Sequence, residues 1–548
     1  MVLAEPPADV VTTLDVAPVA APREEVRRAP WRRTERAAEA ALIAIAVAAT
    51  AVGIIVRFTG PRALWLDEAL TVNISRLPLP RLFDALRHDG SPPGYYLLLH
   101  YWMGLFGTGT RAVRALPAVL SVLTLGVAWR LGNAVGGRRV GAILVVVLAC
   151  NPFALRYGTE NRMYAFVMLL AAGVLLAVVR TLQHPSLRRL LCLGLLSGLL
   201  LLAHYWAIYL VGALAAVLLG ASWRGPVRSN ARMALLAVAA GGLLFLPWAP
   251  SFVFQALHTG TPWATPINTS LFLWTLGEFA GWERRLGAAL FAAYCCTLGL
   301  VLVAVVLRWS RRGRRVADVV GWRRPVPGSR FVLPTAAVFV ITLALALVGG
   351  LVAHSAFAFR YASVVLPALV LLVALGIAAV DRTRLGRTAG SAVLAAVAVL
   401  GTVTGAEQVN AQRTQAIQVA TAIANGARPG DVVAYCPDQL GPAVSRLLPD
   451  RLLTQITFPR FDDPQRINWV DYGQVNAAAN PGVFANEVLS MAAGHQIWLV
   501  WEAGYRTFGR DCEQIRDAME VARPNVTEAV TSDPRQFYEH ESVVRFAP

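Results

Sequence analysis

The chain has 548 residues, of which 56% are hydrophobic and 15% are charged, and the apolar residues occur in long runs. This composition excludes an ordinary soluble protein and indicates a polytopic α-helical membrane protein. The formal net charge of +17 does not indicate a nucleic-acid partner, because the basic residues gather in short clusters between apolar runs, as they do in cytoplasmic loops held against anionic lipids.

Residues 1–37 contain many prolines, alanines and arginines without a sustained apolar period, and we interpret them as a disordered cytoplasmic tail. The segment is too long, and has the wrong flanks, for a cleaved signal peptide, so the apolar run at 38–56 is predicted to remain as the first membrane span. The arginines before this run predict a cytoplasmic N-terminus, which places the stretch LWLDEALTVNISR, residues 64–76, on the outer side.

The membrane domain is predicted to cover residues 38–405, with about eleven transmembrane helices that alternate with arginine clusters. Its spans are expected at 38–56, 111–135, 140–155, 163–180, 190–204, 206–222, 232–249, 286–307, 331–353, 361–380 and 388–405. Residues 92–107, PPGYYLLLHYWMGLFG, are short for a crossing and are predicted to form an in-plane helix in the first outer loop, where Tyr and Trp rings are favoured. An odd number of spans places the C-terminus outside.

Residues 406–548 differ from the membrane domain, because short strand-like segments such as DVVAYC, TQITF, QIWLVW and SVVRF alternate with helical patterns. We interpret them as an extracytoplasmic α/β domain. Cys436 and Cys512 are its two cysteines and the candidate pair for a disulfide, in a compartment that permits one, but sequence alone does not place them close together. Five aromatic residues of this domain have two interpretations, either stacking on sugar rings or packing in the domain core: Trp469, Tyr472, Trp498, Trp501 and Tyr505.

Polar residues that can take part in catalysis or ligand binding concentrate in the predicted outer loops. The predicted inner loops are short, rich in arginine and without a Walker-type glycine loop. We therefore expect an energy source other than cytoplasmic ATP. The outer motifs are WLDEA, RHDGSPPGYY, RYGTENRMY, AHYW and FRYAS.

The order of these motifs resembles the GT-C membrane glycosyltransferases, and most closely the protein-mannosyltransferase and aminoarabinose-transferase-like branch. The resemblance is carried by the acidic pair after the first span and by RHDGSPPGYYLLLHYWMGLFG, TRAVRALPAVLSVLTL, RYGTENRMY and FRYASVVLPALVLL, and it covers most of residues 40–380. It implies a GT-C-like fold and an enzyme that moves a sugar from a polyprenyl-phosphate donor to an acceptor on the outer face of the plasma membrane.

Asp67 and Glu68 are the candidate catalytic residues for this reaction. An acceptor hydroxyl that attacks an anomeric carbon must lose its proton, and Asp67 is the predicted general base. Glu68 would point about 100° away on a helix, so it is expected to orient the site or to bind a cation. Both residues also have a structural interpretation, as caps of an interfacial helix.

The leaving group would be a lipid phosphate, whose developing charge calls for cationic or hydrogen-bonding groups. The candidates for binding the donor phosphate or lipid are Arg360, Tyr361, Arg162 and His258, because arginine can hold phosphate through two parallel hydrogen bonds. Attack opposite the phosphate would invert the anomeric centre. Arg360 at a membrane end could instead extend toward lipid head groups.

A further set of outer-loop residues is predicted to bind the donor or acceptor sugar: Asp89, Tyr95, Tyr157, Glu160, Tyr164 and His204. The alternatives are a turn motif for Asp89 and an ordinary loop ion pair for Glu160, next to Asn161, where other branches carry an aspartate. The sequence leaves open whether a divalent metal binds, because the candidate ligands Glu68, His204 and His258 do not have the close spacing of a metal-binding motif.

The expected partners are membrane lipids, a polyprenyl-phosphate sugar and an envelope glycan, glycolipid or protein as the acceptor, with no nucleic acid. Two other functions are compatible with a protein that has many membrane spans: a catalytically inactive cell-envelope scaffold and a lipid-linked sugar transporter. A transporter predicts ionisable residues inside the spans and internal repeats, but the spans consist mostly of Ala, Leu, Val and Gly. The identity of the sugar and of the acceptor is not encoded in these motifs.

Overall fold

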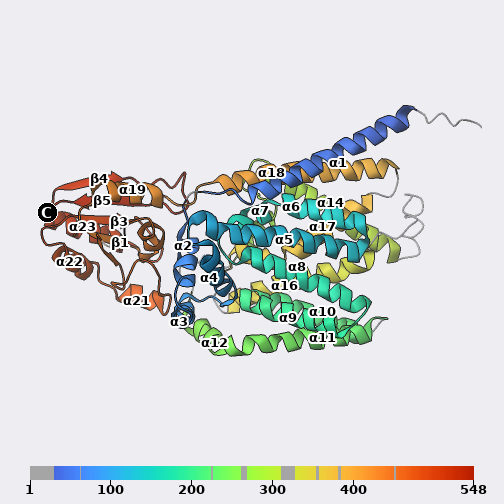
Figure 1. Cartoon of the computed structure of the whole chain (residues 1–548), viewed down its shortest axis with the longest axis horizontal. Coiled ribbons are helices and arrows are strands. Elements are labelled where there is room, and N and C mark those ends of the chain that lie inside the picture. The colour runs from blue at the N-terminus through green and yellow to red at the C-terminus, as the bar shows by residue number, and fades with distance from the viewer. Residues whose placement is uncertain are drawn as a thin grey trace, which may run out of the picture.

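The computed structural model describes residues 30–61, 63–223, 226–260, 268–309, 328–352, 357–380, 384–449 and 452–548. Helices of the membrane domain run side by side along the long axis, and the C-terminal domain caps one end of this bundle (Figure 1). Residues 1–29 of the predicted tail lie outside the described part, and the first helix begins at Pro30, before the expected boundary at residue 37.

The bundle consists of long apolar helices and several shorter ones. Its members are α1 (Pro30–Val56), α5 (Thr110–Gly136), α6 (Arg138–Cys150), α7 (Pro152–Thr159), α8 (Tyr164–Gln183), α9 (Leu187–Ala203), α10 (Ala207–Trp223), α11 (Arg228–Gly242), η1 (Leu243–Trp248), α12 (Ala249–His258), α13 (Thr269–Glu278), α14 (Gly287–Trp309), α16 (Ser329–Val352), η2 (Phe359–Val364), α17 (Leu366–Val380) and α18 (Arg384–Asn410).

Within the described residues, seven helices are long and apolar enough to cross a membrane, or up to eight if the bent pair α6–α7 counts as one span. The predicted number of eleven is therefore not confirmed. The segments expected at 190–204, 206–222 and 361–380 form α9, α10 and α17, which have 17, 17 and 15 residues, whereas a crossing takes about 20. Helix α17 is buried along almost its whole length, and a helix buried inside a bundle is as apolar in sequence as one that faces lipid.

Three short helices lie at the end of the bundle that faces the C-terminal domain: α2 (Leu66–Ser75), α3 (Leu79–Asp89) and α4 (Gly94–Phe106) (Figure 1). Helix α2 begins with two acidic residues in its first turn, where a negative charge is favoured by the helix dipole. Helix α3 ends at Gly90, whose φ of 85° is the left-handed conformation that glycine adopts without strain. Helix α4 corresponds to the short helix predicted at 92–107.

The C-terminal domain is a mixed sheet of five strands in the order β2-β1-β3-β5-β4. The three strands β2 (Thr454–Thr457), β1 (Val432–Cys436) and β3 (Ile497–Trp501) are parallel, and β5 (Ser542–Phe546) and β4 (Val526–Val530) are antiparallel to their neighbours. Strand β4 was absent from the sequence prediction because it is an edge strand with exposed polar residues.

Helices pack around this sheet, and its core contains most of the aromatic residues in question. The helices are α19 (Ala416–Gly426), η3 (Asp438–Leu440), α20 (Gly441–Ser445), α21 (Tyr472–Ala478), α22 (Pro481–Met491) and α23 (Asp511–Ala522). A disulfide joins Cys436 of β1 to Cys512 of α23, the pairing put forward from the sequence. Tyr472, Trp498 and Trp501 are core residues.

The buried Arg57 ties α1 to the bend between α6 and α7. Pro152 begins α7 and has no N–H to donate to the carbonyl of Leu148, one turn earlier, and the two helices meet at 59°. Arg57 donates to the carbonyls of Leu148 and Ala149, at 3.1 and 2.7 Å, and to Ser121 Oγ at 2.8 Å. It thereby supplies donors to two carbonyls at the end of α6, where helical partners run out. The Leu148 carbonyl also accepts a hydrogen bond from the backbone N–H of Asn151 at 3.4 Å, so the Ala149 carbonyl is the one that depends on Arg57.

We expect Arg57→Met to lower the melting temperature of the detergent-solubilised protein. The methionine fills part of the space but leaves the buried Ala149 carbonyl without its donor, at a cost of about 1–3 kcal/mol. The control is Arg36→Met, at an exposed position of α1, which should melt like the wild type. Equal melting temperatures for all three proteins would contradict this role of Arg57.

Candidate active site

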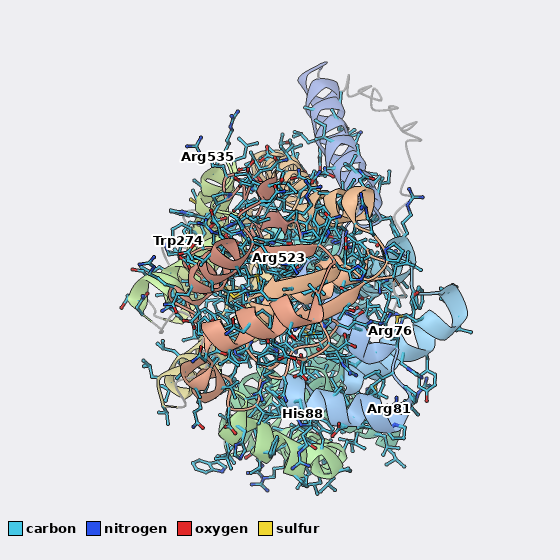
Figure 2. The ribbon with its side chains drawn as sticks, turned by 90° about the vertical axis from the view of Figure 1, so that its left-hand side faces the viewer. Arg76, Arg81, His88, Trp274, Arg523 and Arg535 are labelled. Carbon is cyan, nitrogen blue, oxygen red and sulfur yellow. A yellow bond between two sulfur atoms is a disulfide. The ribbon has the colours of Figure 1, made fainter. Side chains whose placement is uncertain are left out.

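A cavity of about 430 Å³ lies between the end of the bundle and the C-terminal domain. Figure 2 looks onto that domain from outside and shows Arg76, Arg81 and His88, from the segment that contains α2 and α3, beside it. The membrane domain contributes Trp65, Asp67, Leu70, Asp89, Ser91, Arg162, Arg360 and Tyr361 to the cavity wall. The C-terminal domain contributes Gln439, Leu440, Trp469, Glu502, Gly504, Tyr505, Arg506, Tyr538 and Glu539.

Asp67 and Arg360, which the sequence analysis assigned separately, meet in this cavity. Asp67 lies in the first turn of α2 and Arg360 in η2, and Arg360 Nη2 is 3.4 Å from Asp67 Oδ2. The Arg360 guanidinium also lies 5.8 Å from the centre of the Trp65 ring. Both charged side chains are less than one-fifth exposed, so their attraction is only weakly screened by solvent.

Arg162 is a second cation of the same wall, and hydrogen bonds hold it in place. Its Nη1 donates to Thr71 Oγ1 at 2.7 Å, to Tyr96 Oη at 3.2 Å and to the carbonyl of Asp67 at 3.3 Å. Tyr96 in turn donates to Asp89 Oδ2 at 2.9 Å. Burial raises the pKa of Asp89, although Arg162 acts in the opposite direction.

Glu68 is turned away from the cavity, as its position one residue after Asp67 on a helix predicts. It is 1% exposed, and it accepts hydrogen bonds from both Nε and Nη2 of Arg114 and from the backbone N–H of Asn161. Arg114 belongs to α5, and Asn161 to the turn before α8. The structure therefore gives Glu68 the role of fixing α2 to the bundle and does not place it at the reacting groups.

Several predicted sugar-binding residues lie behind the cavity wall. Glu160 Oε2 pairs with Arg413 Nη1 at 2.5 Å, and burial raises the pKa of Glu160 despite this arginine. Tyr95 is fully buried and donates to Asn161 Oδ1 at 2.9 Å. The ring of Tyr157 is likewise buried. These residues do not line the cavity and instead pack the turn that carries Arg162.

The His204 ring packs against the rings of both Tyr361 and Tyr164. The His204 ring lies 4.9 Å from the Tyr361 ring and 6.2 Å from the Tyr164 ring, and its Nδ1 accepts a hydrogen bond from the backbone N–H of Trp206. Burial, together with Arg162 and Arg360, lowers the pKa of His204 to about 3, so the ring is neutral. Neither residue lines the cavity.

His258 connects the two domains and does not line the cavity. Its Nδ1 lies 3.2 Å from Asp471 Oδ1, and the backbone N–H of Asp471 donates to the His258 carbonyl at 2.8 Å. The structure therefore separates His258 from Arg162 and Arg360, with which the sequence analysis grouped it. In the part of the chain that the structure describes, no three His, Cys, Asp or Glu side chains are placed to hold a metal ion, so the metal-binding suggestion for Glu68 and His258 finds no ligand set there.

The C-terminal domain supplies site residues that the sequence analysis missed. Glu539 accepts hydrogen bonds at 3.2 Å, on both carboxylate oxygens, from the backbone N–H of Leu66, at the start of α2. The Tyr538 ring meets the Trp65 ring edge-on at 6.0 Å. These partners are more than 470 residues apart in the chain, so no spacing or motif could have joined them.

Carboxyl groups gather on this side of the cavity. Burial raises the pKa of Glu502 to about 7, and burial together with Asp67 and Glu502 raises the pKa of Glu539 above the ordinary carboxyl value. Burial also raises the pKa of the neighbouring Glu541, with Glu539 and Glu502 adding to the effect. His540 Nε2 lies 3.2 Å from Glu502 Oε1. The wall opposite the two arginines is therefore rich in carboxyl groups that are costly to ionise.

Comparison with known proteins shows what this chain is similar to. Residues 90–250 match the family described as dolichyl-phosphate-mannose-protein mannosyltransferase. The fold is similar to ArnT from Cupriavidus metallidurans in the apo state, with a TM-score of 0.61 and 14% identity over 93% of this chain and 98% of that chain. The same protein bound to undecaprenyl phosphate gives a TM-score of 0.56 at 14% identity, over 92% and 97%.

The arabinofuranosyltransferase AftD from mycobacteria is similar at a TM-score of 0.50 and 16% identity, over 92% of this chain and 41% of that chain. No curated protein matches the chain. The family match and the shared fold confirm the resemblance to GT-C membrane glycosyltransferases of the protein-mannosyltransferase and ArnT branch. They also confirm a multi-pass membrane protein with a C-terminal mixed α/β domain.

We expect Glu68→Gln to destabilise the protein strongly, because it leaves the buried guanidinium of Arg114 without a carboxylate, at a cost of about 3–5 kcal/mol. Thermal unfolding of the solubilised protein measures the effect. The double variant Glu68→Leu with Arg114→Met removes both charges and should lose less stability than the sum of the two single changes. Additive losses would mean that the pair is not a coupled unit.

Glu539→Gln should flatten the dependence of the melting temperature on pH. Since burial raises the pKa of Glu539, its contribution to stability is complete below the ordinary pKa of 4.5 and is lost as pH rises through the higher value of the folded protein. The wild-type melting temperature should therefore fall further than that of Glu539→Gln as the pH rises from about 5 to about 8. The exposed Glu528→Gln is the control and should keep the wild-type slope.

Proposed function

Because the chain carries the protein-mannosyltransferase family region on the fold of ArnT, we propose that it transfers a sugar from a polyprenyl phosphate to a hydroxyl group of an envelope glycan, glycolipid or protein. The reaction would take place on the outer face of the plasma membrane. The arginine clusters of the sequence support this orientation, with the N-terminus in the cytoplasm and the C-terminal domain outside.

The observation that carries the proposal is the meeting of Asp67 with two arginines at one cavity. Arg360 lies 3.4 Å from the Asp67 carboxylate, and Arg162 donates to the backbone carbonyl of the same residue. Transfer from a lipid phosphate needs a base for the acceptor hydroxyl and cations for the departing phosphate. Asp67 is suited to the first task, and Arg162 and Arg360 to the second.

In the proposed step, the acceptor oxygen forms a bond to the anomeric carbon while the bond between that carbon and the phosphate oxygen breaks. The electron pair of the broken bond stays on the polyprenyl phosphate, and the hydroxyl proton moves to the Asp67 carboxylate. Attack on the face opposite the phosphate inverts the anomeric centre. Arg360 would contact both Asp67 and the phosphate, so that donor binding loosens the ion pair and leaves the carboxylate free to accept a hydrogen bond from the acceptor hydroxyl.

Tyr361 and Asp89 complete the proposed donor and acceptor contacts, because both line the cavity. Tyr361 stands directly after Arg360 and rests on the His204 ring. Asp89 is joined to Arg162 through Tyr96, so the charge on Asp89 and the position of Arg162 are linked. A change at Asp89 should therefore alter the donor site as well as the acceptor side of the cavity.

We expect Asp67→Asn to lose transfer by about 100-fold to 10,000-fold, the usual contribution of a positioned base. The measurement is the transfer of radiolabelled sugar from a panel of polyprenyl-phosphate sugars to endogenous envelope acceptors, in membranes with matched amounts of protein. The control is Asp84→Asn on α3, an exposed aspartate that should transfer like the wild type.

Transfer by Asp67→Asn at the wild-type rate would show that Asp67 is not the base. If the wild-type protein itself transfers sugar from none of the donors, an inactive envelope scaffold or a lipid-linked sugar transporter replaces the enzyme as the proposed function. A melting-temperature measurement on Asp67→Asn separates loss of catalysis from loss of folded protein, because Asn preserves the size of the side chain but removes the charge that Arg360 faces.

A further inference from the structure

The C-terminal domain turns the carboxyl ends of its parallel strands toward the cavity. From β1 the chain passes to β2 on one side, and it then returns to β3 on the other side of β1, so the direction of winding reverses at β1. In open sheets of this kind, the connections that follow two such strands separate and leave a crevice at their carboxyl ends, where ligands bind.

The residues that follow these two strands are the ones that line the cavity. Gln439 and Leu440 come just after β1, and Glu502, Gly504 and Tyr505 come just after β3. The backbone N–H of Glu502 donates to the Cys436 carbonyl at 3.2 Å, which keeps the ends of the two strands together. The crevice of the C-terminal domain and the cavity of the membrane domain are therefore one continuous space.

The two walls of this space differ in their charged groups. On the membrane side, Arg162 and Arg360 face the cavity together with Asp67 and Asp89, whereas on the domain side the carboxyl groups of the wall are those of the half-buried Glu502 and the buried Glu539. Arg506 also belongs to the domain wall but is exposed. A phosphate is favoured beside the arginines and disfavoured beside the carboxyl groups, so the domain wall suits the substrate that carries no phosphate.

Gln439 offers a buried polar atom on this wall. It is 1% exposed, and its Nε2 donates to Tyr472 Oη at 3.2 Å. Its Oε1 is buried and has no hydrogen-bond partner among the described residues. An unpaired buried acceptor costs free energy unless a ligand or water donates to it, and the hydroxyl group of a ligand is such a donor.

Two aromatic rings flank these polar groups. Trp469 and Tyr505 line the cavity and are only partly buried, unlike Tyr472, Trp498 and Trp501. The backbone N–H of Trp469 donates to the His88 carbonyl at 3.0 Å, which holds the Trp469 backbone beside the end of α3. Rings held beside carboxyl and amide groups combine an apolar face with hydrogen-bonding partners, the combination that a sugar ring with its apolar face and hydroxyl edge requires.

We infer that the crevice at the carboxyl ends of β1 and β3 binds the acceptor, and that the acceptor is the free end of a glycan chain. Its hydroxyl groups would bond to Glu502 and Gln439, and its rings would contact Trp469 or Tyr505. The inference rests on the proposed function in one respect: the bound glycan would present a hydroxyl group to Asp67 across the cavity and receive the sugar there. The volume of about 430 Å³ suits the sugar ends of two substrates and excludes a folded protein domain.

Binding can be measured on the full-length protein in lipid nanodiscs, without any donor. The probes are methyl glycosides of a short mannopyranose oligosaccharide and of a short arabinofuranose oligosaccharide, and an uncharged peptide that contains Ser and Thr. Isothermal titration should show that one of the oligosaccharides binds the wild type. At pH 8, above the raised pKa of about 7 at which Glu502 ionises, Glu502→Gln should weaken that binding about tenfold or more, the effect of losing a hydrogen bond to a charged group.

Glu528→Gln is the matched control, because it makes the same change at an exposed position on β4, away from the crevice. It should bind like the wild type. Tyr505→Leu removes a ring from the wall and is the second test variant should Glu502→Gln fail to fold. Binding of the peptide alone, binding of neither oligosaccharide, or wild-type affinity in a folded Glu502 variant and in Tyr505→Leu would each overturn the inference.

Turnover of polyprenyl-phosphate mannose and polyprenyl-phosphate arabinofuranose by the wild type is measured separately. If neither donor reacts while an oligosaccharide still binds in a manner that depends on Glu502, the proposed function fails and the binding site stands. If a donor reacts but acceptor binding does not depend on Glu502 or Tyr505, the proposed function stands and the crevice is not the acceptor site.

Discussion

The position of α2 is the constraint on which the site depends, and it is held from two directions. From the membrane side, Glu68 is bonded to Arg114 and to the backbone of Asn161. From the opposite side, Glu539 of the C-terminal domain accepts hydrogen bonds from the first N–H group of the helix, at Leu66. Asp67 lies between these two anchors, so its carboxylate is presented to the cavity by contacts that it does not make itself.

This arrangement explains why the two adjacent carboxylates have different roles. On a helix, successive side chains point about 100° apart, so a helix that lies across the end of the bundle can bury one and present the other. Glu68 is buried and paired with Arg114, so its role is structural. Asp67 lies 3.4 Å from Arg360, a distance that a bound phosphate would change. The proposed transfer from a lipid phosphate requires one base and a fixed position for it, for which we propose Asp67 and Glu68, respectively.

The cavity also depends on charged side chains that come from two domains. Arg162 and Arg360 come from turns of the membrane domain, whereas Glu502 and Glu539 come from the sheet domain. The arginines are held by neighbours in their own domain, as Arg162 is by Thr71 and Tyr96. The domain interface therefore joins the two sets of side chains, and the cavity beside Asp67 has walls from both domains.

The sequence by itself determined the class of protein, the place of the short helix at 92–107 and the identity of the residues around the first turn of α2. Long apolar runs, acidic residues after the first span and arginines close to the ends of apolar runs are local patterns, and Asp67, Arg162 and Arg360 are recognisable from them. Only the tertiary structure decided that α9, α10 and α17 are short helices of the bundle, because an apolar run has the same composition whether it faces lipid or protein. It also assigned His258 to Asp471 and brought Glu539 to Leu66, since contacts over such separations follow from the packing of whole domains, which local sequence patterns do not encode.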